Sequence, residues 1–196
     1  MNFTNNNNNC NFRPMCIIGT TGPRGATGPT GPTGECTCPC QSVGEMIING
    51  GMENVLNDQP TDWLFINPDG VASVDAQGRV HSGNFAVNIE DESAIYQTIP
   101  ITNGGCFYNL SFFARGEGAQ VSFTATVTFE TPNGPVVGGT IFVREQDVPN
   151  SNRDFGFYNL ITTASPLDTT AITVRFDVSA AGEQSLDLDD VSLSVY

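Results

Sequence analysis

The sequence predicts an all-β head, an antiparallel jelly roll or β-sandwich, that is preceded by a short collagen-like Gly-X-Y segment and a disordered, cysteine-containing N-terminal tail. Three observations predict this order. Residues 1–18 are polar and include an asparagine tract that offers no apolar face to a core. Glycine then occupies every third position from Gly19 to Gly34. After Glu45, short runs of alternating apolar and polar residues begin, and turn sequences separate them.

Residues 1–18 are expected to attach the protein to something else. Cys10 and Cys16 flank a partly apolar stretch, and they could join neighbouring subunits through disulfides or dock into another protein. Incidental thiols in an unstructured tail are the alternative. The tail has neither the charged nor the apolar region of a secretory signal. A cytoplasmic location and transport to an outer surface by another route therefore both remain open.

Residues 19–36 form six consecutive triplets with glycine first. Three chains in polyproline-II geometry can wind around a common axis only if every third residue lacks a side chain. Proline in the second position of three triplets presets φ near the required value. A flexible linker needs no such strict period. We therefore expect a homotrimer held by this segment, with a semi-rigid spacer as the alternative.

The cysteines around the linker, residues 37–44, are expected to secure that trimer. Six triplets alone would hardly offset the entropy of ordering three chains, so the ends of the segment need cross-links. Cys36, Cys38 and Cys40 are spaced by one residue and point alternately in an extended chain, which suits bonds to different chains. We predict interchain disulfides at Cys10, Cys16, Cys36, Cys38 and Cys40. A metal site is one rival, although the second cysteine pair of usual zinc sites is missing; no special role is the other.

Residues 45–196 are predicted to be the head. Nine runs rich in β-branched and aromatic residues are the expected strands: 71–74, 84–89, 94–99, 107–114, 120–129, 136–143, 156–162, 171–178 and 185–195. Alternate residues from Val121 to Phe129 are apolar and the residues between them are serine or threonine, so one face of that strand is buried. Cys106 is the only cysteine in the head and is expected to be a buried free thiol.

Composition narrows the function classes. The hydrophobic content of 39% is enough for a core in a head of this length. The net charge of −14 disfavours nucleic acid as a partner, because phosphates need a basic surface, and it favours divalent cations. No apolar run approaches the length that spans a bilayer, so membrane insertion is not expected.

Motifs in the head resemble those of jelly-roll carbohydrate-binding modules with a galactose-binding-like fold. The matching stretches are INGGMEN at 48–54, Trp63, HSGNFAV at 81–87, YNLSF at 108–112 and LDDVSL at 188–193. The resemblance implies a structural calcium ion held by Glu53 and the first aspartate of the last strand. Adjacent strand residues point to opposite faces, so only one of Asp189 and Asp190 should serve, and we choose Asp189. Alternatively, Asp190 is solvated and Glu53 caps a turn.

The Gly-Pro-Thr run before an all-β head separately resembles bacterial collagen-like surface proteins, in particular glycoproteins of the exosporium and appendages of spores. That resemblance implies assembly on the spore surface without a secretory signal. It also implies partner proteins of the spore surface or of fibres for the N-terminal segment. The third positions of four triplets would carry O-glycans: Thr21, Thr27, Thr30 and Thr33.

The function expected from the sequence is structural display, without catalysis. His81 lies beside Ser82, but adjacent residues do not make a catalytic triad, and no nucleophile-elbow sequence is present. The alternative is a lectin-like adhesin in which Trp63 stacks against a sugar ring, with Phe65, Tyr96 and Tyr158 as further candidates. Packing of Trp63 in the core at a sheet edge is the competing interpretation of that residue.

Overall fold

The structure, a computed structural model, describes Cys40 and residues 44–196. The tail, the Gly-X-Y segment and most of the linker therefore lie outside the described residues. So do the predicted interchain cysteines Cys10, Cys16, Cys36 and Cys38, and the predicted O-glycosylation sites Thr21, Thr27, Thr30 and Thr33.

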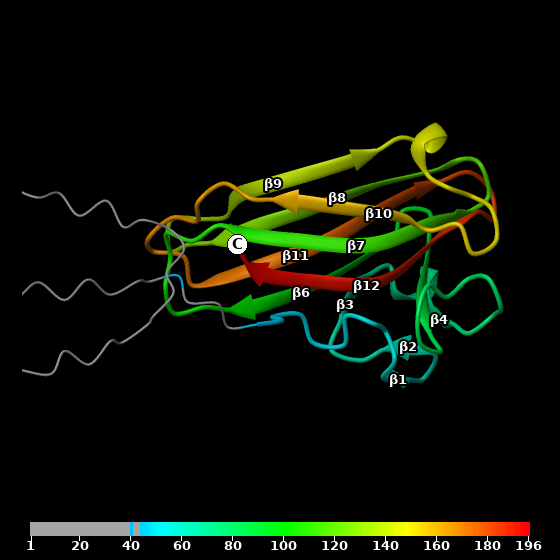
Figure 1. The fold of residues 1–196 in the computed structure, drawn as a ribbon, viewed down its shortest axis with the longest axis horizontal. Coiled ribbons are helices and arrows are strands. Elements are labelled where there is room, and N and C mark those ends of the chain that lie inside the picture. The colour runs from blue at the N-terminus through cyan, green and yellow to red at the C-terminus, as the bar shows by residue number, and fades with distance from the viewer. Residues whose placement is uncertain (1–39, 41–43) are drawn as a thin grey trace, which may run out of the picture.

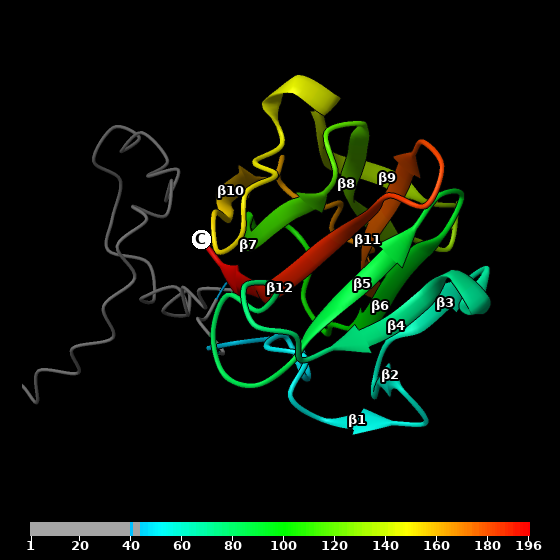
Figure 2. The same ribbon diagram turned by 90° about the vertical axis from the view of Figure 1, so that its right-hand side faces the viewer.

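Two five-stranded antiparallel sheets pack face to face (Figures 1 and 2). The β7 sheet has the order β10 (Gly156–Ile161), β7 (Tyr108–Glu117), β12 (Ser185–Val195), β5 (Ala86–Glu90) and β4 (Val71–Val74). The β8 sheet has the order β3 (Leu64–Ile66), β6 (Ala94–Pro100), β11 (Ala171–Ala180), β8 (Val121–Glu130) and β9 (Val136–Val143). This arrangement confirms the predicted all-β sandwich.

Smaller elements complete the described part of the chain. They are the ribbon of β1 (Val55–Leu56) and β2 (Gln59–Pro60), and the 3-10 turns η1 (Pro68–Gly70) and η2 (Glu145–Asp147). In the part of the chain that the structure describes, no helix has the length and apolar character needed to cross a membrane.

The core lies between the sheets and follows the predicted alternation. The odd-numbered residues from Val121 to Phe129 are buried, and the residues between them are partly exposed. Phe112 of β7 meets Phe123 and Phe176 of the β8 sheet edge to face, with ring centroids 5.9 and 4.9 Å apart. Each such burial stabilises the fold by about 1.5–3 kcal/mol. These aromatic contacts therefore join the two sheets.

All nine predicted strands are present, and their ends differ from the prediction by no more than three residues. The strands that the sequence did not indicate are β1, β2 and β3, which are too short to show alternation. One of the turn sequences between strands, Asn67-Pro68-Asp69-Gly70, contains η1, and Asn67 precedes η1 in the left-handed region with φ of 53°. Asparagine tolerates that conformation better than most residues.

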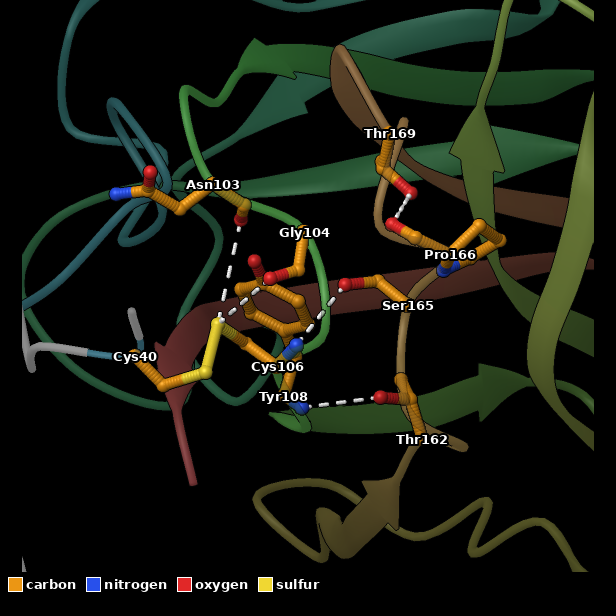
Figure 3. Close-up of a disulfide and its surroundings, with 9 residues drawn as sticks. All are labelled: Cys40, Asn103, Gly104, Cys106, Tyr108, Thr162, Ser165, Pro166 and Thr169. Atoms are coloured by element: carbon orange, nitrogen blue, oxygen red, sulfur yellow. Dashed lines mark hydrogen bonds between the residues drawn. A yellow bond between two sulfur atoms is a disulfide. The ribbon is translucent and has the colours of Figure 1, made fainter. Parts of the chain in front are cut away.

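Cys40 and Cys106 form a disulfide within the chain (Figure 3). Their Cα atoms are 5.4 Å apart, within the usual range for this bond. Two predictions are therefore wrong: Cys106 is not a free thiol, and Cys40 does not bond to another chain. The short spacing of Cys36, Cys38 and Cys40 suggested one shared role for the three cysteines. The partner of Cys40 instead follows 66 residues later, so this spacing could not indicate the bond. The linker is thus tied, through Cys40, to the loop that precedes β7.

Hydrogen bonds between two neighbouring loops, one containing Cys106 and the other Ser165, fix the position of Cys106 (Figure 3). The Cys106 N–H donates to Ser165 Oγ at 3.1 Å, and the Ser165 N–H donates to the Cys106 carbonyl at 2.8 Å. A Cβ at Gly104 would overlap the carbonyl oxygen of Pro166. Glycine is therefore required there for the loops to approach so closely.

Loss of the disulfide should destabilise the head. Because the bond closes a loop of 66 residues, Cys106→Ser should lower the free energy of unfolding by about 2–4 kcal/mol, measured by urea denaturation of the full chain. Adding reductant to Cys106→Ser should cause no further loss. A Cys36→Ser/Cys38→Ser double variant should retain the full stability of the head. Titration of a reactive Cys106 thiol in the unreduced protein would contradict the assignment.

Candidate functional site

Asp189 is buried beneath the loop of residues 75–85, hereafter the covering loop. Its Oδ2 accepts the N–H groups of His81 at 2.9 Å and Ser82 at 3.1 Å. Burial raises the pKa of Asp189 to about 6; the neighbouring charge of Asp190 adds to that rise, and the backbone N–H donors oppose it. The cost of burying this charge is thus only partly offset by its hydrogen bonds.

Glu53 binds the far end of the covering loop. Its Oε1 accepts the N–H groups of Asn84 at 2.7 Å and Phe85 at 2.9 Å, and its Oε2 accepts the Asn84 amide at 2.9 Å. Burial raises the pKa of Glu53, but the hydrogen bonds from Phe85 and Asn84 outweigh this and leave the pKa lowered. The two predicted calcium ligands therefore hold neighbouring parts of one loop.

The expectation that Asp189 and Asp190 point to opposite faces is wrong. A bulge interrupts β12 between Asp189 and Ser192, and Asp190 has a left-handed φ of 49°. Asp190 consequently reaches the same loop as Asp189. Its Oδ2 lies 2.6 Å from His81 Nδ1, and its Oδ1 accepts the Ser82 hydroxyl at 2.9 Å.

Gly50 of the INGG motif allows residues 48–54 to lie directly against this bulge. The Val191 N–H donates to the Gly50 carbonyl at 2.9 Å. A Cβ at Gly50 would overlap the Val191 carbonyl oxygen, so only glycine permits the contact. The first and last segments of the head therefore meet beside the carboxylates.

These residues fit a hard divalent cation in their donor type. One ligand atom each from His81, Asp189 and Asp190 lies within 4.8 Å of the others, and Glu53 is not a member of that group. Carboxylate oxygens suit calcium, and a cation would offset the repulsion between the two aspartates. Glu53 and both aspartates already accept hydrogen bonds from the chain. Calcium at Glu53 and Asp189 stays a prediction.

A buried charge network, which the sequence did not indicate, fastens the covering loop. Asp187 is fully buried and accepts Arg79 Nε at 3.0 Å and Arg79 Nη2 at 2.7 Å. Buried Arg115 lies 3.4 Å from Asp187, pairs with Glu117 and donates to the Gly78 carbonyl at 2.8 Å. Hydrogen bonding to Asp187 raises the pKa of Arg79. Asp187 thus pairs with Arg79 and Arg115. The alternation of Asp187 and Asp189 in the sequence does not indicate these pairs.

The outer face of the β8 sheet presents a second candidate site. Strand register places one row of side chains across all five strands: Leu64, Tyr96, Arg175, Thr126 and Thr140. Leu64 and Thr140 are exposed, and the three residues between them are half-buried. The row therefore combines an aromatic ring, a guanidinium and hydroxyl groups on an accessible surface.

The polar groups around that row are already held in place. Arg175 Nε donates to both carboxylate oxygens of Asp177 at 2.9 Å, and hydrogen bonding to Asp177 raises the pKa of Arg175. The Thr173 hydroxyl donates to Glu130 at 2.8 Å and lies 3.0 Å from the Thr98 hydroxyl. Fixed donors and acceptors lose little entropy when they meet a ligand.

Trp63 lies in neither candidate site: it is not part of the surface row on the β8 sheet, and it is not part of the carboxylate cluster around Asp189. Only 4% of it is exposed, its indole donates to the Asn49 carbonyl at 3.1 Å, and its ring packs against Phe176. The prediction that Trp63 stacks on a sugar is therefore wrong, and core packing is the correct interpretation. Replacing Trp63 would test folding rather than binding.

An open cleft of about 840 Å³ runs beside the covering loop. Its lining mixes acidic, basic and amide side chains, including Asp75, Gln77, Asn84 and Arg153. This mixture selects no single class of ligand, so the row on the β8 sheet is the stronger candidate.

Comparison with solved structures shows the fold. The chain resembles TmCBM61 in complex with β-1,4-galactotriose, with a TM-score of 0.60, 17% identity and coverage of 76% of this chain and 97% of that one. It resembles a family 16 carbohydrate-binding module with a TM-score of 0.54, 15% identity and coverage of 76% and 98%.

The enzymatically active domain of tailspike protein 4 from bacteriophage CBA120 is also similar, with a TM-score of 0.58 and 17% identity; 78% of this chain but only 21% of that one is covered. Neither a protein-family model nor a curated protein matches this chain. The chain therefore has the β-sandwich fold seen in carbohydrate-binding modules, and that fold also occurs within a catalytic protein.

The raised pKa of Asp189 gives the calcium prediction a pH signature. Its folded pKa of about 6 exceeds the value of about 4 in an unfolded chain, so this group's contribution to stability is largest at low pH and is lost as pH rises through about 6. A cation at Asp189 would offset that loss. Calcium should therefore raise the Tm at about pH 7.5 more than at about pH 5, relative to chelator.

The matched control for this experiment is an exposed aspartate on η1. Asp189→Asn should abolish most of the calcium response, whereas Asp69→Asn should leave it unchanged. An identical Tm with calcium and with chelator at both pH values would refute the calcium prediction.

Proposed function

We propose that this chain is a non-catalytic surface protein whose head binds glycans on the outer face of the β8 sheet. The observation that carries the proposal is the row from Leu64 to Thr140, which crosses all five strands and is exposed or half-buried with respect to the described residues. A sugar ring presents apolar C–H faces and a rim of hydroxyls. The row offers a partner for each.

Tyr96 and Arg175 are the residues on which binding should depend most. The Tyr96 ring can pack against a C–H face while its hydroxyl stays hydrated. Arg175 and Asp177 together supply charge-assisted donors and acceptors to vicinal hydroxyls. Thr126 and Thr140 extend the hydroxyl-binding row toward β9.

The similar solved structures support an oligosaccharide ligand. The one bound to β-1,4-galactotriose shares the sandwich fold, and a row that crosses five strands about 4.8 Å apart is long enough for more than one sugar ring. The low identity transfers no binding residue, so the proposal rests on the row itself.

The proposed display system lies mainly outside the described residues. It consists of a homotrimeric collagen-like stalk at 19–36, interchain disulfides at Cys10, Cys16, Cys36 and Cys38, and O-glycans at Thr21, Thr27, Thr30 and Thr33. The resemblance of this segment to spore glycoproteins supports placement on an exosporium or appendage. A head stabilised by calcium would suit an extracellular setting.

A purely structural role is the second candidate. The Cys40–Cys106 disulfide ties the head to the chain four residues after the Gly-X-Y segment ends. Such a tether favours a head that must stay attached to a stalk, whether or not it binds a ligand.

Loss of Arg175 should separate the two candidates. On a glycan array probed with the full chain, Arg175→Ala should weaken binding by about 10- to 150-fold, because a charged hydrogen bond contributes about 1.5–3 kcal/mol. Arg144→Ala is the matched control, since Arg144 is exposed and its ion pair among the described residues is with Asp147 on η2. Absence of any glycan ligand, or unchanged binding by both Arg175→Ala and Tyr96→Ala, would leave the structural role standing.

A further inference from the structure

One part of the β7 sheet's outer surface carries no charged side chain. It comprises the outward-facing side chains of residues 107–113, 157–161 and 192–196, hereafter the neutral face. Leu110, Tyr158 and Leu193 alternate with these residues and point into the core. In Figure 1 the three strands of this surface, β10, β7 and β12, lie side by side.

The neutral face carries apolar side chains at both of its ends, and serine and asparagine side chains lie between them. Phe157 is 58% exposed, Ile161 is 45% exposed and Phe107 is 40% exposed. Phe157 pairs with Phe113 across the strands, with ring centroids 5.1 Å apart, and Tyr196 lies next to Phe107 at the other end. Single exposed apolar residues are ordinary, whereas two apolar groups on one uncharged surface favour an interaction site.

The charge distribution selects the partner. The whole chain has a net charge of −14, so copies of it repel one another over most of their surface. The outer face of the β8 sheet carries Glu130, Arg175 and Asp177, but the neutral face has no charge to desolvate. Interface cores are likewise depleted in charged residues. The neutral face is thus suited to contact between copies of this chain.

The attachment point places this face where copies would meet. Phe107 directly follows Cys106, which is bonded to Cys40. Cys40 is only four positions after Cys36, where the Gly-X-Y segment ends, a span of at most about 14 Å. Chains gathered by that segment would bring the Phe107 ends of their neutral faces together.

We propose that the neutral face is the contact surface between the heads of neighbouring copies of this chain. The proposal rests on the collagen-like display part of the proposed function and is independent of glycan binding. Contact between heads would supply the stabilisation that six Gly-X-Y triplets lack. It would also leave the outer face of the β8 sheet free for a ligand.

The test measures the mass of the full chain in solution by sedimentation equilibrium over a concentration series. The parent protein carries Cys10, Cys16, Cys36 and Cys38 changed to serine, so that disulfides cannot join chains, while Cys40–Cys106 remains. The parent should associate. Phe157→Asp with Ile161→Asp should weaken association by at least about tenfold, because charges would enter an apolar contact.

The matched control pair lies on β9, in the β8 sheet. Phe142 and Val137 are 65% and 62% exposed, so Phe142→Asp with Val137→Asp makes the same chemical change elsewhere and should leave association intact. Asn159→Arg adds a charge to the neutral face without removing an apolar side chain, and it should also weaken association. Thermal melts followed by circular dichroism check that each variant folds.

Two results would overturn the proposal: a parent that is monomeric at every concentration, or association that neutral-face variants and control variants leave equally strong. Arg175→Ala should not alter the mass. Failure of glycan binding and failure of this contact are therefore read from different variants and different measurements.

Discussion

Compensation of the buried negative charges on β12 determines how the covering loop packs against the β7 sheet. Asp187 and Asp189 are both fully buried, and their compensating groups come mainly from the covering loop: the Arg79 guanidinium for Asp187, and the N–H groups of His81 and Ser82 for Asp189. Uncompensated buried charges cost several kcal/mol each. The covering loop is therefore held against the sheet largely by electrostatics, since none of residues 75–85 belongs to the hydrophobic core.

The same constraint accounts for neighbouring features that look unrelated in sequence. The bulge after Asp189 turns Asp190 toward His81, and the His81 ring stacks on Phe113 with centroids 3.6 Å apart. Gly50 then packs directly on the bulge. Beyond Phe113 the sheet surface is no longer covered, and its outward side chains change from charged to neutral. The covering loop thus sets one boundary of the neutral face.

Local patterns in the sequence predicted the strands well because each strand buries one face. Alternation along residues 121–129 needs no knowledge of the partner strand. Pairing between distant residues was not predictable in that way. The Cys40–Cys106 bond and the contacts of Asp187 with Arg79 join residues separated by 66 and 108 positions, and only the assembled sheets bring them together.

Residue type alone also misassigned the ligand-binding aromatic residue. A single tryptophan suggested a sugar platform, but Trp63 satisfies its indole N–H within the core. Tyr96 was a secondary candidate from the sequence, whereas Arg175 became a candidate only when strand register placed it beside Tyr96. The resemblance predicted Asp189 as a calcium ligand. The contact of Asp190 with His81 depends on the bulge, which no alternating pattern signals.

The two outer surfaces of the sandwich differ in a way that suits separate tasks. One carries fixed charges and hydroxyls in a row, which favours a polar ligand with many hydroxyl groups. The other has no charged side chain and carries apolar groups at both ends, and it begins beside the disulfide that ties the head to the rest of the chain. In an acidic protein, self-association through the charged surface would have to overcome repulsion and desolvation together. An arrangement that avoided both costs would place copies in contact through the β7 sheet and leave the β8 sheet facing outward.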